Sequence, residues 1–545
     1  MSLRVQPFPT LPEETARVAR RALRKGSLYL VLGEQIGHVF EDEDFRDLYA
    51  LQGEPALSPA QLTLVLILQA LEGLSDREAA EAVRARIDWK YALHLHLEDQ
   101  GFDFSVLADF RDRLVSHEAG TRVLDRLLQR MRALQLLKER GKQRTDATYV
   151  LSAARALNRL ELVWESMWVT LESLAKVAPT WLRGVVLPHW GERYDIAWRG
   201  SRLPKGKEQR SALAASIGAD GAHLLAVGHA RGAPREVAEC AAFQLLEKIW
   251  AQQYEQRAGS WRWRAAGTLP AGVELIQTPY DAEARYAEHR EHSWKGYTVH
   301  FTETCDPDRP RLITHVEVTP ATQTGVEALA DIHRGLQKSQ CLPQTHLADT
   351  GYVAGHTIEE SEHDYGIELI GPVPESTSWQ AQQGGFTPEQ FQIDWKQQRA
   401  VCPEGQTSSC WSESHDEFAQ PIVHIVFPRA VCHRCASRCR CTRAKGGRTL
   451  KLRLSFAAIV QARHYQQTPE FAALYAQRAG IEGTISEAVR KHGARVSRYL
   501  GLKKTWLQQI LLAAAINLER ATRWLSGLKP KSTRISHFAM LMAAA

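Results

Sequence analysis

The stretch from Trp294 to Val373 constrains the fold most, because strand and helix patterns alternate along it. In "WKGYTVHFTETC", Tyr297, Val299 and Phe301 alternate with polar neighbours, which is the period of a β-strand. "RPRLITHVEVTPA" predicts a second strand, "GVEALADIHRGLQ" a helix, and "THLADTGYV" and "YGIELIGPV" two further strands. This order predicts an α/β core built around a central sheet.

Residues 1–140 predict an all-helical N-terminal domain. Ser58 stands before Pro59 in "LSPAQLTLVLILQAL", and Ser75 stands three residues before Glu78, which are the spacings of helix N-caps. The short turn "EGLS" joins the two helices as in a helix-turn-helix, which could enter a DNA groove. An α-hairpin in a bundle core is an equally good interpretation.

The rest of the chain divides by composition. We expect residues 141–372 to hold the first part of the α/β core, interrupted by a helical insertion at about 151–265. Residues 373–446 are rich in Gln, Ser and Cys and predict a small β-rich insertion. Residues 447–528 are expected to complete the core, with helical periodicity from about Pro469, and residues 529–545 to form a loosely ordered tail.

Charge is distributed very unevenly along the 545 residues. Residues 421–545 hold 22 Lys and Arg against 4 Asp and Glu, whereas residues 1–420 hold 46 against 58. A basic block of this kind indicates a surface that faces a polyanion such as DNA, and the alternative is a solvated surface without a partner.

Membrane and secreted classes are not favoured. The start of the chain lacks the apolar segment of a signal peptide, and the apolar run Leu62–Leu74 is too short to span a bilayer. Six of the nine cysteines fall between Cys402 and Cys441, unlike a secreted disulfide scaffold. We therefore expect a cytoplasmic protein without a membrane partner, associated with the nucleoid.

Three acidic residues form a candidate metal site. Tyr475, Arg478 and Glu482 would share about 60° of a helix circumference, although a surface ion pair alone would explain Arg478 and Glu482. Asp146 stands at the head of the β-prone run "DATYVL", and Asp349 at the end of a strand. Three carboxylates so placed suit two Mg²⁺ or Mn²⁺ ions, which can activate a nucleophile and stabilise the leaving oxygen of a phosphodiester.

The sequence closely resembles the DDE transposases of bacterial insertion sequences, in the branch with a Tyr-x2-Arg-x3-Glu-x6-Lys signature. Tyr475, Arg478 and Glu482 have those spacings, whereas Val489 stands where that branch has its basic residue. Arg490 and Lys491 lie just beyond it. The resemblance extends almost end to end, through "LSDREAAEAVRARIDWKYALHL", "FDFSVLADFRDRL", "TDATYVLSAARALNRLELV", "WKGYTVHFTETCD", "LADTGYV", "GIELIGPVP", "RAGIEGTISEAVR" and "LKKTWLQQILLAAAINLER".

The resemblance implies an RNase H-like core in which Asp146, Asp349 and Glu482 are the catalytic metal ligands. It also implies binding to the terminal inverted repeats of the element and to target DNA, in a synaptic complex that we expect to be a homodimer. Tyr475 and Arg478 would hold the DNA backbone. The other candidate DNA-binding residues are the basic residues that follow them, Arg490, Lys491, Arg495, Arg498, Lys503 and Lys504.

The cysteines predict a second kind of metal site. Cys402 in a Cys-Pro-x-Gly turn, Cys432 and Cys435 in a Cys-x2-Cys pair, and Cys441 could close a tetrahedral structural zinc site. Related transposases favour this set, which would leave Cys410 and Cys439 outside it. The alternative is a set of reduced cysteines in a small β-rich insertion.

The predicted activity is cut-and-paste DNA transposition by metal-dependent strand cleavage and strand transfer. The freed 3′-hydroxyl of the element would attack target DNA. A domesticated, non-catalytic DNA-binding regulator is one alternative, and a metal-dependent DNA nuclease without transposition is another.

Overall fold

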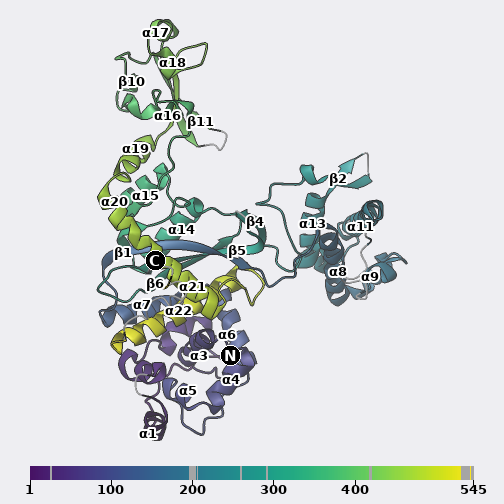
Figure 1. Cartoon of the computed structure of the whole chain (residues 1–545). Coiled ribbons are helices and arrows are strands. Elements are labelled where there is room, and N and C mark those ends of the chain that lie inside the picture. Colours follow the sequence, from purple (N-terminus) through teal and green to yellow (C-terminus); the bar gives the residue numbers. More distant parts are fainter. Residues whose placement is uncertain are drawn as a thin grey trace.

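The computed structural model describes residues 1–24, 27–195, 206–257, 260–289, 292–416 and 420–528, together with Pro204 and Leu541. A central sheet lies between the N-terminal helices on one side and two protruding units, one helical and one rich in cysteine (Figure 1). Apart from Leu541, the tail expected at residues 529–545 lies outside the described residues.

The central sheet has six strands, and its middle strand is β1. Along the sheet the hydrogen-bonded order is β4-β5-β1-β7-β8, with β6 also paired to β5. β5 runs antiparallel to β1 and β6, whereas β7 is parallel to β1 and to β8. This mixed sheet is compatible with an RNase H-like core. The strands are β1 (Arg140–Leu151), β4 (Arg285–His289), β5 (His292–Thr304), β6 (Ile313–Pro320), β7 (Pro343–Leu347) and β8 (Glu368–Ile370).

Strand β5 confirms the predicted alternation, since Tyr297, Val299 and Phe301 are fully buried. Strand β1 begins earlier than the β-prone run "DATYVL" indicates. The first half of the strand, residues 140–145, precedes that run. Two polar residues of this first half are buried in hydrogen-bonded pairs: the Gln143 amide donates to the carbonyl of Cys341 at 2.7 Å, and Arg144 pairs with Glu303. A buried strand of paired polar residues lacks the apolar signal that sequence reading requires.

Two helices of the core, α14 and α15, alternate with the strands, and the helices α19 to α22 come after the last strand. α22 is buried along most of its length, and it packs against β6 on one side and against α3 and α7 of the N-terminal region on the other. The Asn517 amide of α22 exchanges two 2.7 Å hydrogen bonds with the backbone of Ile313. The helices are α14 (Gly325–Lys338), α15 (Gly355–Tyr365), α19 (Phe456–Tyr465), α20 (Pro469–Tyr475), η6 (Ala476–Ala479), α21 (Gly480–His492) and α22 (Leu502–Leu525).

The N-terminal region is helical as predicted. Ser75 and Glu78 form both hydrogen bonds of a capping box, and the Ser58 hydroxyl accepts from the backbone N–H of Gln61. Its apolar core continues without a break through α22 into the sheet. None of the helices in the described ranges is both long and apolar enough to cross a membrane. The elements are α1 (Glu13–Ala22), α2 (Leu28–Val31), η1 (Leu32–Ile36), η2 (Asp42–Leu48), α3 (Pro59–Glu72), α4 (Asp76–Ala85), α5 (Ile87–Ala92), α6 (Ser105–Ser116) and α7 (Gly120–Ala133).

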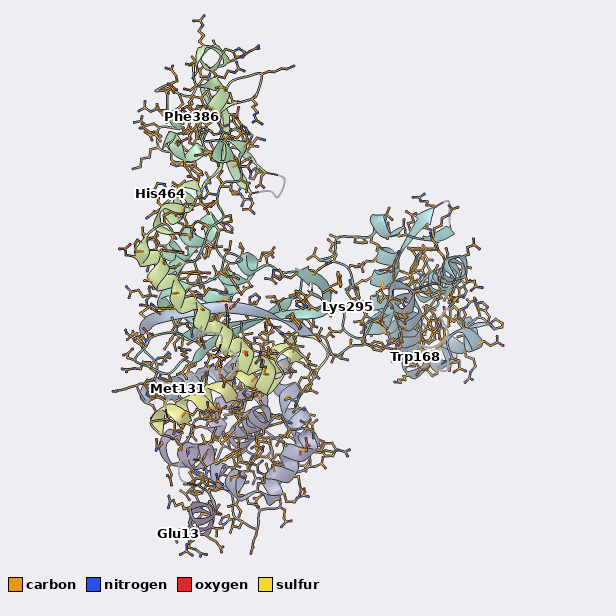
Figure 2. All side chains as sticks on the ribbon, in the orientation of Figure 1. Glu13, Met131, Trp168, Lys295, Phe386 and His464 are labelled. Carbon is orange, nitrogen blue, oxygen red and sulfur yellow. The ribbon has the colours of Figure 1, made fainter. Side chains whose placement is uncertain are left out.

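The unit between β1 and β4 has its own apolar core and protrudes from the sheet; Trp168 lies in it and Lys295 near its connection (Figure 2). Helix was expected to about residue 265, but residues 254–257 and 260–263 form two antiparallel strands, β2 and β3. Tyr254, Trp261 and Trp263 are aromatic residues that a strand accommodates readily. The elements are α8 (Arg159–Val177), α9 (Pro179–Val185), α10 (Trp190–Arg193), α11 (Lys207–Gly228), α12 (Arg235–Glu239), α13 (Ala241–Gln253), β2 (Tyr254–Arg257), β3 (Ser260–Trp263) and η4 (Ala266–Thr268).

The cysteine-rich unit also has a separate small core, which includes Phe386; His464 marks the helix that joins this unit to the sheet (Figure 2). Strand β13 pairs with β12, so the unit extends past the expected boundary at residue 446. Apolar and polar residues alternate in "TLKLR" over only five positions, which is too short to predict a strand within the neighbouring polar sequence. The elements are α16 (Trp379–Gln382), η5 (Pro388–Gln390), β9 (Gln392–Asp394), β10 (Arg399–Val401), β11 (Cys410–His415), β12 (Pro421–Val426), α17 (Arg429–Arg434), α18 (Arg438–Cys441) and β13 (Thr449–Arg453).

Candidate active site

Asp146 lies on β1, and Asp349 follows the end of β7, the neighbouring parallel strand. Arg144 of β1 is in register with Leu347 of β7, so the residues two positions further along, Asp146 and Asp349, lie level with each other. Asp146 is in the middle of β1 rather than at its head, because the strand begins at Arg140. Asp349 follows the end of β7 in a turn, where its Oδ1 accepts the backbone N–H of Gly351 at 2.9 Å.

One guanidinium lies among the three predicted carboxylates. Nη2 of Arg478 is 2.9 Å from Oδ2 of Asp146 and 3.7 Å from Oδ2 of Asp349, and Nη1 is 3.8 Å from Oε1 of Glu482. The Arg478 side chain is only 14% exposed, and its Nε is buried without a hydrogen-bond partner. The structure thus brings together four residues from β1, the turn after β7, η6 and α21.

The electrostatics of this cluster centre on Asp146. Burial raises the pKa of Asp146 above its usual range, and the charges of Asp349 and Glu482 act in the same direction, whereas Arg478 opposes them. Burial also raises the pKa of Tyr475, again with opposition from Arg478. A buried carboxylate with two further carboxylates beside it favours a nearby cation, so the cluster is suited to bind a positive charge.

The helix that carries Arg478 and Glu482 differs from the continuous one assumed from the sequence. α20 ends at Tyr475, the 3-10 helix η6 carries Arg478, and α21 begins at Gly480. The Tyr475 ring stacks on Phe471 at 5.4 Å. A Cβ on Gly480 would lie 2.2 Å from Nη1 of Arg144, so the close approach of β1 requires glycine there.

Most of the predicted DNA-binding residues contact the protein itself. Lys491 pairs with Glu519, Lys503 with Glu118 at 2.9 Å, and Lys504 with Asp112 at 2.7 Å. Arg495 donates to the Thr148 hydroxyl at 2.9 Å and covers the Tyr149 ring. Arg498 donates to both carbonyls of the α3–α4 turn, those of Gly73 and Leu74. Arg490 is exposed.

These contacts have a physical cause that a count of charged residues along the chain does not reveal. The acidic N-terminal part of the chain packs against the basic C-terminal part, so part of the basic excess is neutralised within the fold. Lys503 and Lys504 nonetheless stay 65% and 45% exposed. Exposed ion pairs are weak and exchange readily, so these side chains remain available to a phosphate.

A second cluster of acidic residues lies between α21 and α22. Glu487, His492 and Glu519 have ligand atoms within 4.8 Å of one another; among the described residues neither the three carboxylates nor the cysteines are as tightly grouped. However, Arg520 pairs with Glu487 at 2.7 Å, and Arg523 with Glu519 at 2.8 Å. Each carboxylate of this cluster has at least one cation of its own, whereas a single guanidinium is shared by the three predicted carboxylates, so this cluster is the weaker candidate for a metal ion.

Four cysteines line one pocket in the cysteine-rich unit, and they are the four predicted as a set: Cys402, Cys432, Cys435 and Cys441. Cys410 and Cys439 are exposed and do not line it. Backbone N–H groups of Gln406 and Arg448 point at the sulfurs of Cys402 and Cys432, at 3.3 and 3.4 Å. Soft sulfur donors that receive such hydrogen bonds fit a zinc ion.

Sequence reading missed a buried ion network next to the carboxylates. Glu303, Arg144 and Arg520 are its charged members. A signal was present, because Glu303 continues the register of Tyr297, Val299 and Phe301, the face of β5 that points into the core. A carboxylate at a core-facing strand position requires a buried partner.

Two parts of the chain match family models of known proteins. Residues 401–522 match the family model of a transposase DDE domain, and residues 18–113 match that of a transposase domain (DUF772). The first match includes Arg478 and Glu482 but neither Asp146 nor Asp349. No curated protein matches the chain.

The mixed sheet is compatible with an RNase H-like core, and the two family matches identify the class of protein as a transposase. The chain belongs to the DDE transposases of the insertion-sequence type.

Proposed function

We propose that the chain cuts the ends of an insertion sequence and joins them to target DNA, with Asp146, Asp349 and Glu482 as ligands of the divalent ions. The observation that carries the proposal is the meeting of these carboxylates around one guanidinium, at 2.9–3.8 Å, from elements far apart in sequence. A coincidental surface ion pair would involve two residues and not three carboxylates on separate elements.

The donor set fits Mg²⁺ or Mn²⁺. All three ligands are hard oxygens, and Asp349 and Glu482 are 41% and 70% exposed, which leaves room for water and for a phosphate oxygen. Two such ions, when bound, would activate the attacking oxygen and stabilise the leaving oxygen of the phosphodiester. Asp146 is held by β1 and Asp349 by its turn, so their directions are set before DNA arrives.

The other residues would position the DNA. The Arg478 guanidinium can pair with the carboxylates or with a phosphate oxygen, and the Tyr475 hydroxyl can donate to a second phosphate oxygen. The exposed Arg490 and the exposed lysines of α22, Lys503 and Lys504, would add further phosphate contacts. The transposase family matches and the charge distribution support DNA as the partner. We extend the proposal to terminal inverted repeats and target DNA as substrates, to a homodimer as the synaptic form and to the nucleoid as the place of action.

The cysteine pocket supports a separate proposal, one structural zinc ion held by Cys402, Cys432, Cys435 and Cys441. It would compensate for the small size of the apolar core of that unit, because domains with little buried surface commonly depend on a metal.

A nicking assay tests the proposed activity. Supercoiled plasmid that carries the DNA flanking the gene would be incubated with Mg²⁺ and either the wild type, Glu482→Gln or Glu470→Gln. Glu470, an exposed residue of α20, provides the same chemical change away from the carboxylates. We expect nicking and joined products from the wild type and from Glu470→Gln, and none from Glu482→Gln.

The alternatives give different products. Equal nicking by Glu482→Gln and the wild type would refute the catalytic assignment. Binding of the flanking DNA without any nicking by the wild type would indicate a DNA-binding regulator. Cleaved but never joined DNA would indicate a nuclease.

A further inference from the structure

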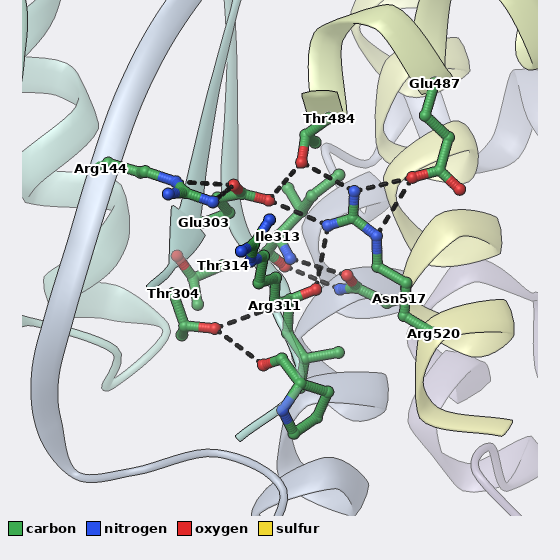
Figure 3. Close-up of polar contacts among 12 residues, drawn as sticks. Arg144, Glu303, Thr304, Arg311, Ile313, Thr314, Thr484, Glu487, Asn517 and Arg520 are labelled. Carbon is green, nitrogen blue, oxygen red and sulfur yellow. Dashed lines mark hydrogen bonds and ion pairs between the residues drawn. The ribbon is translucent and has the colours of Figure 1, made fainter. Parts of the chain in front are cut away.

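Glu303 is a charged residue with no exposure to solvent, and both of its carboxylate oxygens are paired (Figure 3). Oε1 accepts from Nε and Nη2 of Arg144 at 2.8 and 2.6 Å. Oε2 accepts from the Thr484 hydroxyl at 2.5 Å and from Nη1 of Arg520 at 2.9 Å. The carboxylate therefore lies between two guanidinium groups and a hydroxyl.

The partners of Glu303 belong to the elements that carry the candidate ligands. Arg144 is on β1, two residues before Asp146, and also donates to the carbonyl of Gln477 in η6. Thr484 is on α21, two residues after Glu482. Glu303 thus connects the strand of one ligand directly to the helix of another.

Arg520 closes the network from α22. Its Nη2 donates to the Thr484 hydroxyl and to Glu487, both at 2.7 Å, so α21 is held at two successive turns. Burial alone would lower the pKa of Arg520, but Glu303 and Glu487 raise it, so its charge is retained. The Asn517 amide anchors the same helix to β6.

An apolar cluster would serve stability as well as this network does, because burying ions is costly even when they are paired. Hydrogen bonds, however, have one favourable geometry, whereas apolar side chains can slide against one another. A fully satisfied buried network therefore defines the distance and rotation of α21 relative to β1. Gly480 allows this proximity, since a Cβ there would meet the Arg144 guanidinium.

We propose that Glu303 is a positioning residue that, through Thr484, Arg144 and Arg520, sets the place of Glu482 relative to Asp146 and Asp349. The proposal rests on the proposed function, in which those three carboxylates bind the divalent ions. Glu303 itself is fully buried, so it would act through these three neighbours.

Mn²⁺ binding by the full-length protein without DNA tests this role, with free Mn²⁺ followed by electron paramagnetic resonance. Thr484→Val keeps the shape of the side chain but removes the hydroxyl that links Glu303 to α21. We expect its Mn²⁺ affinity to be about tenfold lower than that of the wild type, the size of effect that supporting residues around metal ligands have. Thr484→Ser keeps the hydroxyl and should retain most of the affinity.

Thr314→Val is the matched control. Thr314 is equally buried, and its hydroxyl donates to Gln143 at 2.6 Å, but it does not contact α21. We expect wild-type Mn²⁺ affinity from this variant. An equal loss in Thr314→Val and Thr484→Val, or a loss in Thr484→Ser as large as in Thr484→Val, would overturn the proposal, because general loosening of the core would then explain it.

A further variant separates this proposal from the proposed function. Asp146→Asn should lose the Mn²⁺ that the carboxylates bind. If Asp146→Asn and the wild type bind Mn²⁺ equally, the assignment of the metal ligands is wrong. If Asp146→Asn loses Mn²⁺ while Thr484→Val binds it as tightly as the wild type, the ligands stand and the positioning role is refuted.

Discussion

Replacement of Arg478 with Gln removes the positive charge among the three carboxylates while keeping a polar side chain of similar length. In the protein without divalent ions, Asp146, Asp349 and Glu482 would then repel one another without compensation from this guanidinium. We expect the surrounding structure to lose stability and to regain it when a divalent ion binds.

The pair with Asp146 dominates the magnitude, because its two side chains are only 14% and 16% exposed. Two unit charges 4 Å apart attract by about 4 kcal/mol at an effective dielectric constant of 20, and desolvation offsets part of this. The pairs with Asp349 and Glu482 are more exposed and add at most about 1 kcal/mol each. We therefore expect a loss of about 2–3 kcal/mol in the local free energy of unfolding.

Hydrogen exchange measured by mass spectrometry is the suitable assay, because it reports the stability of β1 and α21 separately from the two protruding units. In EDTA, exchange in these elements should be about 30- to 150-fold faster in Arg478→Gln than in the wild type, since 1.4 kcal/mol is a factor of ten. Mn²⁺ at one hundred times its Kd should restore about 2.7 kcal/mol.

Arg463→Gln is the control. Arg463 pairs with Glu389 at the base of the cysteine-rich unit, where both side chains are about as buried as those of the Arg478–Asp146 pair. The loss of local stability in Arg463→Gln should not be reversed by Mn²⁺. If Mn²⁺ protects Arg478→Gln no more than Arg463→Gln, or if Arg478→Gln exchanges like the wild type in EDTA, the electrostatic reasoning is refuted.

Three further predictions follow from other parts of the structure. Cys432→Ser should lower the zinc content, measured by atomic absorption, from about one ion per chain toward none, whereas exposed Cys410→Ser should leave it unchanged. Gly480→Ala should lower the free energy of unfolding in urea by about 1–3 kcal/mol, because its Cβ would overlap the buried Arg144 guanidinium. A Cβ at Gly483 meets nothing within 4 Å, so Gly483→Ala should raise the free energy of unfolding by about 0.5–1 kcal/mol. Equal effects of the two variants would contradict the packing. Burial lowers the pKa of His333 to about 4, so its contribution to stability is complete above the unfolded pKa of about 6.5. On acidification to about pH 5 the free energy of unfolding should fall by about 2 kcal/mol, because the unfolded chain then binds a proton that the folded protein does not. Urea denaturation at about pH 7 and about pH 5 would measure this difference, and a flat profile would contradict the burial of neutral His333.

Local features of the fold could be predicted from the sequence because their causes are local. The capping box of Ser75 and Glu78 depends on residues three positions apart, and the apolar face of β5 depends on alternation. These two features require no knowledge of distant partners. The set Cys402, Cys432, Cys435 and Cys441 was expected from a Cys-Pro-x-Gly turn, a Cys-x2-Cys pair and the resemblance to related transposases, and the four residues line one pocket.

Other features depended on partners far along the chain. The first half of β1 is not indicated by the sequence, because Gln143 and Arg144 are polar and their burial depends on Cys341 and Glu303. The prediction of DNA-binding residues after Tyr475 rests on their charge, yet Lys503 and Lys504 pair with acidic residues of the N-terminal region. Charge counting contains no information about such pairing.

By itself, the sequence determined the residue types of the site: three acids, one arginine with a tyrosine three residues before it, and a set of soft sulfur donors. Only the tertiary structure decided that Arg478 lies among all three carboxylates and that Glu303 connects their supports. Residue types and local spacing are encoded over a few positions, whereas the approach of Asp146 to Glu482 depends on packing between segments separated by more than three hundred residues.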